Sequence, residues 1–116
     1  MIKRKSEQEA EVRKNMRGGG GEVTIRHYFK KDEINAPSRL CAELRIPPGA
    51  GIGEHEHVEE DEVFIIQQGK GIITDEGREK EVFAGDAILT GKGASHAIRN
   101  NSDAELIVTA IIMQYK

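Results

Sequence analysis

Four side chains in the middle of the chain have the chemistry and the spacing of metal ligands: His55, His57, Glu62 and His96. His55 and His57 are two residues apart, and residues i and i+2 of an extended strand point to the same face. One strand can therefore present both imidazoles to a single ion, whereas on a helix they would diverge. Three imidazole nitrogens and one carboxylate oxygen leave two positions of a six-coordinate ion open for water or substrate. Open positions distinguish a reactive metal site from a structural site, which four protein ligands usually close.

A framework of glycines surrounds these candidate ligands at fixed offsets. The pattern reads G-x5-H-x-H-x4-E-x6-G over residues 49–69 and G-x5-G-x-G-x2-H-x3-N over residues 85–100. It resembles the two-motif signature of the cupin family at every defined position except one, where Gly91 stands in place of the usual proline. This departure falls in a turn and touches none of the candidate ligands. It therefore bears on the stiffness of that loop and not on the metal.

The resemblance implies a cofactor as well as a ligand set. A cupin would hold one divalent transition metal through the four candidate ligands, and their nitrogen and oxygen donors suit Mn²⁺, Fe²⁺, Zn²⁺, Ni²⁺ or Co²⁺. Cupins with this ligand set commonly hold Mn or Fe, which we favour, with Zn, Ni or Co as alternatives. The family allows three or four residues between the second histidine and the glutamate, so Asp61 competes with Glu62. The spacing of six residues to Gly69 favours Glu62.

The rest of the chain alternates short β-prone runs with turn residues. In residues 39–46, for example, Leu40, Ala42, Leu44 and Ile46 share one face of a strand. About nine short strands separated by Gly-, Pro- and Asp-bearing turns predict an all-β jelly-roll, or double-stranded β-helix, barrel. This is the architecture that the resemblance to cupins implies. The expected strands lie in or near residues 22–29, 39–46, 55–57, 62–68, 71–75, 78–83, 87–90, 96–99 and 104–113.

Residues 1–21 are predicted to form a short N-terminal arm, and residues 22–116 the cupin β-barrel domain. Residues 6–17 are polar and helix-tolerant, and Ser6 and Glu9 have the spacing of a capping box, so we expect a short helix or an ordered arm. The four glycines at 18–21 lack the Lys-Ser/Thr of a phosphate-binding loop and are interpreted as a flexible connector. Because the arm is poor in apolar residues, we expect it to pack on a partner subunit.

Several other charged side chains are weaker candidates. Arg39 and Arg45 share the strand face opposite Leu40, and if that face lined the barrel, either could bind a substrate carboxylate through two parallel hydrogen bonds. An exposed or interface position is the simpler interpretation of both arginines. The acidic residues 59–61 are expected to form a solvated loop at the mouth of the cavity. His27 lies outside both motifs and is interpreted as structural or exposed.

Composition excludes several classes of function. A chain of 116 residues forms one domain, and its net charge of −3 indicates neither a nucleic-acid surface nor attraction to a membrane. No apolar stretch approaches the roughly 18 residues of a membrane span. The single cysteine cannot form an internal disulfide, so the chain is predicted to be cytoplasmic.

Two functions from different classes fit these observations. The first is a mononuclear metal-dependent enzyme acting on a small carboxylate- or oxygen-rich substrate, as a decarboxylase, oxygenase or isomerase. Among small single-domain cupins the chain resembles those described as oxalate-decarboxylase-like, although no proton-donating lid residue can be assigned. The alternative is a non-catalytic module that binds a small molecule. A structural protein with a vestigial cavity fits poorly with intact ligands. Sheet edges that need cover predict a homodimer.

Overall fold

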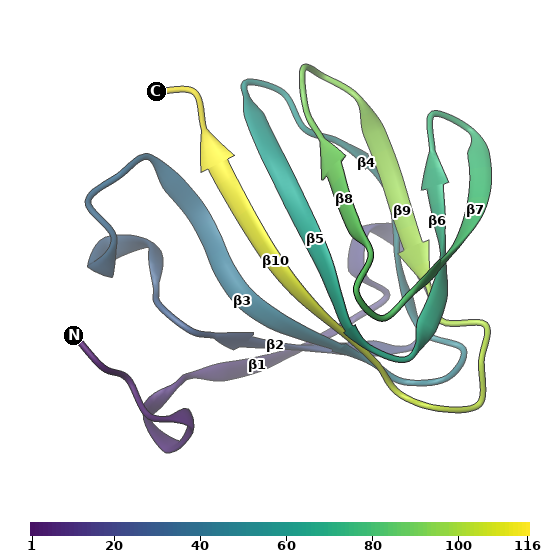
Figure 1. Ribbon diagram of the computed structural model, residues 1–116, viewed down its shortest axis with the longest axis horizontal. Coiled ribbons are helices and arrows are strands. Elements are labelled where there is room, and N and C mark those ends of the chain that lie inside the picture. Colours follow the sequence, from purple (N-terminus) through teal and green to yellow (C-terminus); the bar gives the residue numbers. More distant parts are fainter.

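The computed structural model covers residues 1–116 and contains ten β-strands in two antiparallel sheets (Figure 1). The larger sheet has the strand order β1-β2-β3-β10-β5-β8, and the smaller has the order β4-β9-β6-β7. This confirms the predicted all-β jelly-roll barrel. The strands are β1 (Ala10–Lys14), β2 (Glu22–His27), β3 (Ser38–Ile46), β4 (Gly51–Glu56), β5 (Glu60–Gln68), β6 (Lys70–Asp75), β7 (Arg78–Phe83), β8 (Ala87–Thr90), β9 (Ser95–Arg99) and β10 (Leu106–Gln114). Three single 3-10 turns complete the structure: η1 (Lys5–Glu7), η2 (Met16–Gly18) and η3 (Lys31–Glu33).

Strand β10 lies in the middle of the larger sheet and pairs with β3 on one side and β5 on the other (Figure 1). The three strands alternate buried and less buried residues, because successive side chains of a strand point to opposite faces. On β3 the predicted inward face is confirmed, with Ala42, Leu44 and Ile46 buried and Leu40 partly buried. The opposite face, which carries Arg45, is therefore the outer face of the sheet. Arg39 lies at a register shift between β3 and β10 and does not follow this alternation.

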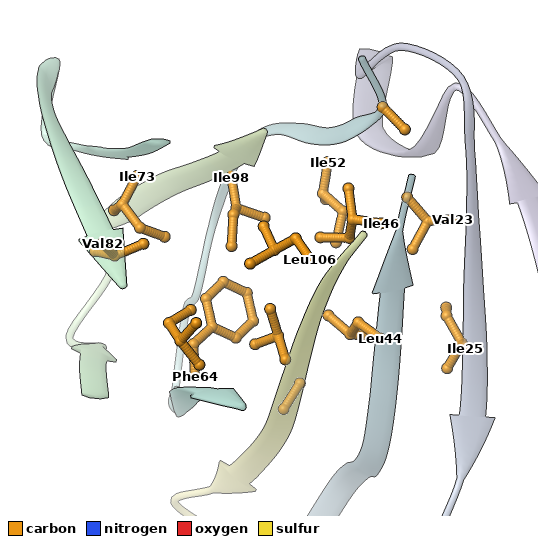
Figure 2. Close-up of a cluster of buried hydrophobic side chains, with 14 of the residues drawn as sticks. Val23, Ile25, Leu44, Ile46, Ile52, Phe64, Ile73, Val82, Ile98 and Leu106 are labelled. Carbon is orange, nitrogen blue, oxygen red and sulfur yellow. The ribbon is translucent and has the colours of Figure 1, made fainter. Parts of the chain in front are cut away.

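The core fills the space between the two sheets (Figure 2). It is almost entirely aliphatic, as the scarcity of aromatic residues predicts, and Phe64 is its one large ring. Burial of such side chains stabilises each by about 1.5–3 kcal/mol relative to exposure. The cluster comprises Val23, Ile25, Ala42, Leu44, Ile46, Ala50, Ile52, Phe64, Ile66, Ile73, Val82, Ile98, Leu106, Val108 and Ala110.

The N-terminal residues extend the larger sheet. Instead of a helix, residues 10–14 form β1, which pairs with β2 over five residues, and the only helical turns here are the single 3-10 turns η1 and η2. A helix here would have had almost no apolar face to bury, whereas pairing with the edge of β2 satisfies the backbone hydrogen bonds directly. The pairing lies within one subunit, although we expected this segment to pack on a partner.

Of the four glycines at 18–21, Gly19 and Gly21 are tightly packed, so the interpretation of this segment as a flexible connector is wrong. They lie against the glycine-rich strand β4, where the Gly51 amide donates to the Gly20 carbonyl at 3.0 Å. A Cβ on Gly19 would lie 2.2 Å from the Gly51 carbonyl oxygen, and a Cβ on Gly53 would lie 2.0 Å from the Arg17 carbonyl oxygen. Only glycine permits two backbones to approach this closely.

Candidate metal centre

The structure brings the four sequence-predicted ligands together at one point between the sheets. His55 comes from β4, Glu62 from β5 and His96 from β9, while His57 follows the end of β4. His55 and His96 are direct partners in the β4–β9 register, which explains how residues far apart in the chain meet. His57 and His96 are each 1% exposed and Glu62 is 4% exposed, whereas His55 is partly buried.

The donor atoms are arranged as neighbours in a coordination shell. Glu62 Oε1 lies 2.8 Å from His57 Nε2 and 2.9 Å from His96 Nε2. His96 Nε2 lies 2.9 Å from His57 Nε2 and 3.2 Å from His55 Nε2. Two ligand atoms at right angles, each about 2.1 Å from one ion, would be about 3 Å apart. These residues therefore fit a single transition-metal ion.

Each of the three imidazoles has a hydrogen-bond partner on its other nitrogen. His55 Nδ1 lies 2.7 Å from the Gly53 carbonyl oxygen, and His96 Nδ1 lies 2.9 Å from Thr90 Oγ1. His57 Nδ1 lies 2.6 Å from Glu60 Oε2. An acceptor on Nδ1 keeps the proton there and leaves the Nε2 lone pair directed at the centre of the cluster, where it could bind a metal. Sequence reasoning missed all three partners.

Glu60 is the main correction to the sequence-based interpretation of this region. It was expected in a solvated acidic loop, but it is 7% exposed and lies between His57 and Arg39. Arg39 donates from Nε at 3.0 Å and from Nη2 at 2.7 Å to the two carboxylate oxygens. The Arg39 guanidinium lowers the pKa of Glu60 to about 2, with a further contribution from His57 and against the effect of burial. Glu60 is therefore ionised at neutral pH.

Burial and hydrogen bonding act against each other on the ligands themselves. Burial opposes ionisation of Glu62, but the hydrogen bonds from His57 and His96 outweigh it and lower the pKa of Glu62. Burial likewise opposes protonation of His57, yet its bonds to Glu62 and Glu60 raise the pKa of His57. Burial lowers the pKa of His55, whose Nδ1 faces the Gly53 carbonyl oxygen and not a carboxylate. The cluster thus holds an anionic carboxylate beside three imidazoles, as a divalent cation requires.

The structure also explains the glycine at the usual proline position. A Cβ on Gly91 would lie 1.9 Å from Asp61 Oδ1, so no larger residue fits there without moving Asp61. Tyr115 donates its hydroxyl proton to Asp61 at 2.7 Å and accepts the Lys92 amide at 3.0 Å. Asp61, the competing ligand, is therefore directed at Tyr115, and Glu62 lies with the histidines.

The two candidate arginines differ in position. Arg39 reaches the metal cluster indirectly, through Glu60. Arg45 donates from Nε to Glu43 and from Nη1 to Glu105, both at 2.8 Å, and does not line the cavity next to the histidines.

A cavity of about 150 Å³ opens beside the cluster and is reached by parts of the chain that sequence reasoning did not connect with it. His27, expected to be structural or exposed, is partly buried and lines this cavity, with its Nε2 2.9 Å from Glu11 Oε2. Phe64 stacks on the His96 ring at 4.9 Å between centroids and also lines the cavity. The full lining is Arg13, Met16, Arg17, Ile25, His27, Arg39, Leu40, Leu44, Ile52, His55, His57, Glu62, Phe64 and Ile112.

This fold and this cluster define a class of protein. Residues 42–112 match the family model described as "Cupin domain", and the chain belongs to the cupin family. The predicted resemblance is thereby confirmed over the strands that carry the whole candidate metal centre.

Two comparisons from one bacterium extend along nearly the whole chain. The chain is 38% identical to an "Oxalate-binding protein" of Thermotoga maritima, over 97% of this chain and 93% of the relative. It also superimposes on the crystal structure of a predicted oxalate decarboxylase from Thermotoga maritima with a TM-score of 0.93 and 38% identity, covering 98% and 99% of the two chains. Each match leaves out only a few residues of this chain and therefore extends well beyond the motif region.

More distant structures share the fold alone. The cupin domain of Schizosaccharomyces pombe Cnp3 has a TM-score of 0.72 and 15% identity, covering 90% of this chain and 68% of that one. None of the helical segments in the structure has the length and apolar character needed to cross a membrane.

Proposed function

We propose that this cupin binds one divalent transition-metal ion through His55, His57, Glu62 and His96 and uses it to bind a small carboxylate. The observation that carries this proposal is the convergence of four donor atoms, spaced 2.8–3.2 Å apart where they are neighbours, at the wall of a cavity. The name of the Thermotoga relative makes oxalate the first ligand to test. Mn and Fe are the favoured metals, with Zn, Ni and Co next.

The metal would supply Lewis-acid binding of a carboxylate oxygen. The residues of the chain then have separate tasks. Gly53, Glu60 and Thr90 hold the three rings in orientation through Nδ1. Apolar side chains on the cavity wall, such as Leu44 and Ile112, limit the water around a bound anion and strengthen its electrostatic attraction.

Catalysis is the second candidate function, and one observation favours it. His27 is the only imidazole on the cavity wall outside the metal cluster, and Glu11 lies within hydrogen-bond distance of its Nε2. A histidine paired with a carboxylate is a common general acid or base. Glu62 is the only carboxylate on the wall and belongs to the cluster, so a proton donor for decarboxylation would have to be His27.

The test begins with protein purified without chelators and without a nickel column. Elemental analysis should find a transition metal, and calorimetry on protein reloaded with Mn²⁺ should detect oxalate binding. CO2 release and O2 uptake are then followed with oxalate, malonate and catechol. Oxalate binding without turnover assigns the protein to the binding class. Turnover that is lost in His27→Ala assigns it to the enzymes. Absence of metal binding contradicts the proposal.

We also propose that two subunits pair through the outer face of the larger sheet. The strand registers place Cys41, Ile111, Val63 and Leu89 in one row across β3, β10, β5 and β8. Leu89 is 69% exposed, and Cys41, Val63 and Ile111 are partly exposed. A contiguous apolar row on a sheet face is typical of a surface that a partner covers.

A further inference from the structure

One wall of the metal cavity is built from the N-terminal residues that the sequence indicated as a separate arm. Arg13, Met16 and Arg17 line the same cavity as His55 and His57. None of the family motifs includes these residues. They come from β1 and from the η2 turn that follows it.

The η2 turn is held firmly against the barrel. Met16 packs on the hydrophobic core, and the carbonyl of Arg17 lies against Gly53, whose own carbonyl is the partner of His55 Nδ1. Asn15 and Arg17 both have left-handed backbone conformations, with φ of 49° and 53°. The left-handed conformation is unfavourable for a residue with a long side chain such as Arg17, so the surrounding contacts must impose it there.

The three arginines on the cavity wall differ in how far their charges are already neutralised. Arg39 uses Nε and Nη2 for both oxygens of Glu60. Arg13 donates from Nε to Glu11 at 2.7 Å. Arg17 has no carboxylate within 4.0 Å. It is therefore the one arginine on the wall whose charge has no anionic partner.

We infer that Arg17 is an anion-recognition residue and that the cavity selects small dianions, in which one carboxylate binds the metal and the second is met by the Arg17 guanidinium. This inference rests on the proposed function and deepens it. A guanidinium binds a carboxylate through charge-assisted hydrogen bonds, which are roughly twice as strong as neutral ones. The cavity volume of about 150 Å³ accommodates ligands of only a few carbon atoms.

The test is calorimetric titration of Mn²⁺-loaded protein with oxalate and malonate as dianions, acetate as a monoanion and oxamide as a neutral analogue of oxalate. Arg17→Gln should weaken oxalate binding by roughly 10-fold or more, and Arg17→Lys should recover part of it. Acetate and oxamide should bind weakly to all variants. Lys14→Gln is the matched control, because Lys14 is on the same segment but pairs with Glu22 and does not line the cavity.

The affinity for Mn²⁺, measured separately by dye competition, should be the same in wild type, Arg17→Gln and Lys14→Gln. Normal Mn²⁺ binding with unchanged oxalate affinity in Arg17→Gln would overturn this inference and leave the metal site standing. An equal loss in Lys14→Gln would also overturn it, because the effect would then be one of general charge. Failure of the wild type to bind Mn²⁺ would contradict the proposed function itself, and the inference would fall with it.

Discussion

His57 and Glu60 form a buried pair in which Nδ1 and Oε2 are 2.6 Å apart, and Arg39 binds the same carboxylate from its other side. The hydrogen-bonded series Arg39–Glu60–His57 thus leads from the start of β3 to the cluster of candidate metal ligands. Such outer partners fix the orientation of a ligand and raise its basicity. Glu60 acts as a positioning residue in this arrangement, since it does not belong to the cluster itself.

Glu60→Gln should weaken metal binding without abolishing it. The amide can still occupy the space, but it carries no charge and can present its NH2 group to Nδ1, so His57 is held less well. Loss of an outer partner typically costs about 10–100-fold in affinity. Competition with a metal-binding dye measures this for Mn²⁺ and Zn²⁺. Arg45→Gln, on the same strand as Arg39 but away from the cavity, should retain wild-type affinity, and an equal loss there would refute the role given to Glu60.

Glu62→Ala and His57→Ala should lose more affinity than Glu60→Gln, by at least roughly 100-fold, because each removes a donor atom and not its support. Elemental analysis of the purified variants measures the loss. His27→Ala is the control histidine, and its metal content should equal that of the wild type. Unchanged metal in both donor variants would show that the ligands have been wrongly assigned.

The stability of the metal-free protein should depend on pH through Glu60. Its pKa is about 2 in the folded protein against 4.5 ordinarily, so the unfolded chain takes up the proton first as the pH falls. The resulting stabilisation is fully present above about pH 4.5 and is lost as the pH falls toward about 2, with a size on the order of 2–3 kcal/mol. Urea unfolding at several pH values, with chelator present, measures it. In Glu60→Gln the free energy of unfolding should fall less steeply over this window, and a slope identical to that of the wild type would argue against the prediction.

Gly53→Ala should destabilise the fold and disturb the cavity together. The added methyl group would meet the Arg17 carbonyl oxygen at 2.0 Å, which forces η2 away from β4. Overpacking of this kind typically costs about 1–3 kcal/mol, and more where backbone must move. Thermal and urea unfolding measure the cost. Gly20→Ala is the control and should be tolerated. Its added Cβ would lie 3.4 Å from the nearest atom, the Gly49 carbonyl oxygen, and the φ of Gly20 is not positive.

Leu89→Lys should convert the proposed dimer into a monomer. It places a charge in the apolar row on the outer face of the larger sheet, where a partner would have to bury it. Light scattering coupled to size-exclusion chromatography gives the mass directly. Val12→Lys, which changes another exposed apolar residue, on β1, should stay dimeric. A wild-type protein that is already monomeric at micromolar concentration would exclude this interface.

The sequence predicted the parts of the site that depend on local spacing. His55 and His57 could be placed together because strand periodicity acts over two residues, and His96 because the family pattern fixes its distance from Gly85 and Asn100. Strand β3 was predicted correctly for the same reason, since its apolar residues alternate over its whole length.

The missing parts depend on contacts between distant segments. Arg39 meets Glu60 only because the starts of β3 and β5 lie on either side of the end of β10, and no local pattern carries that information. A signal was nevertheless present in the spacing of Glu60 three residues after His57. The four glycines at 18–21 have the composition of a linker, and only the facing glycines of β4 show that they are packing residues.

The Phe64 ring joins the hydrophobic core to the candidate metal centre. It is part of the core, and the His96 imidazole stacks on it at an interplanar angle of 11°. A donor group stacked on the packed core is already in place when a cation arrives. Loading and release should therefore take place in an already folded molecule, unlike in zinc fingers, where folding and metal uptake are a single event. The speed of exchange would then report the width of the entrance, and the protein would stay folded when a chelator strips the ion.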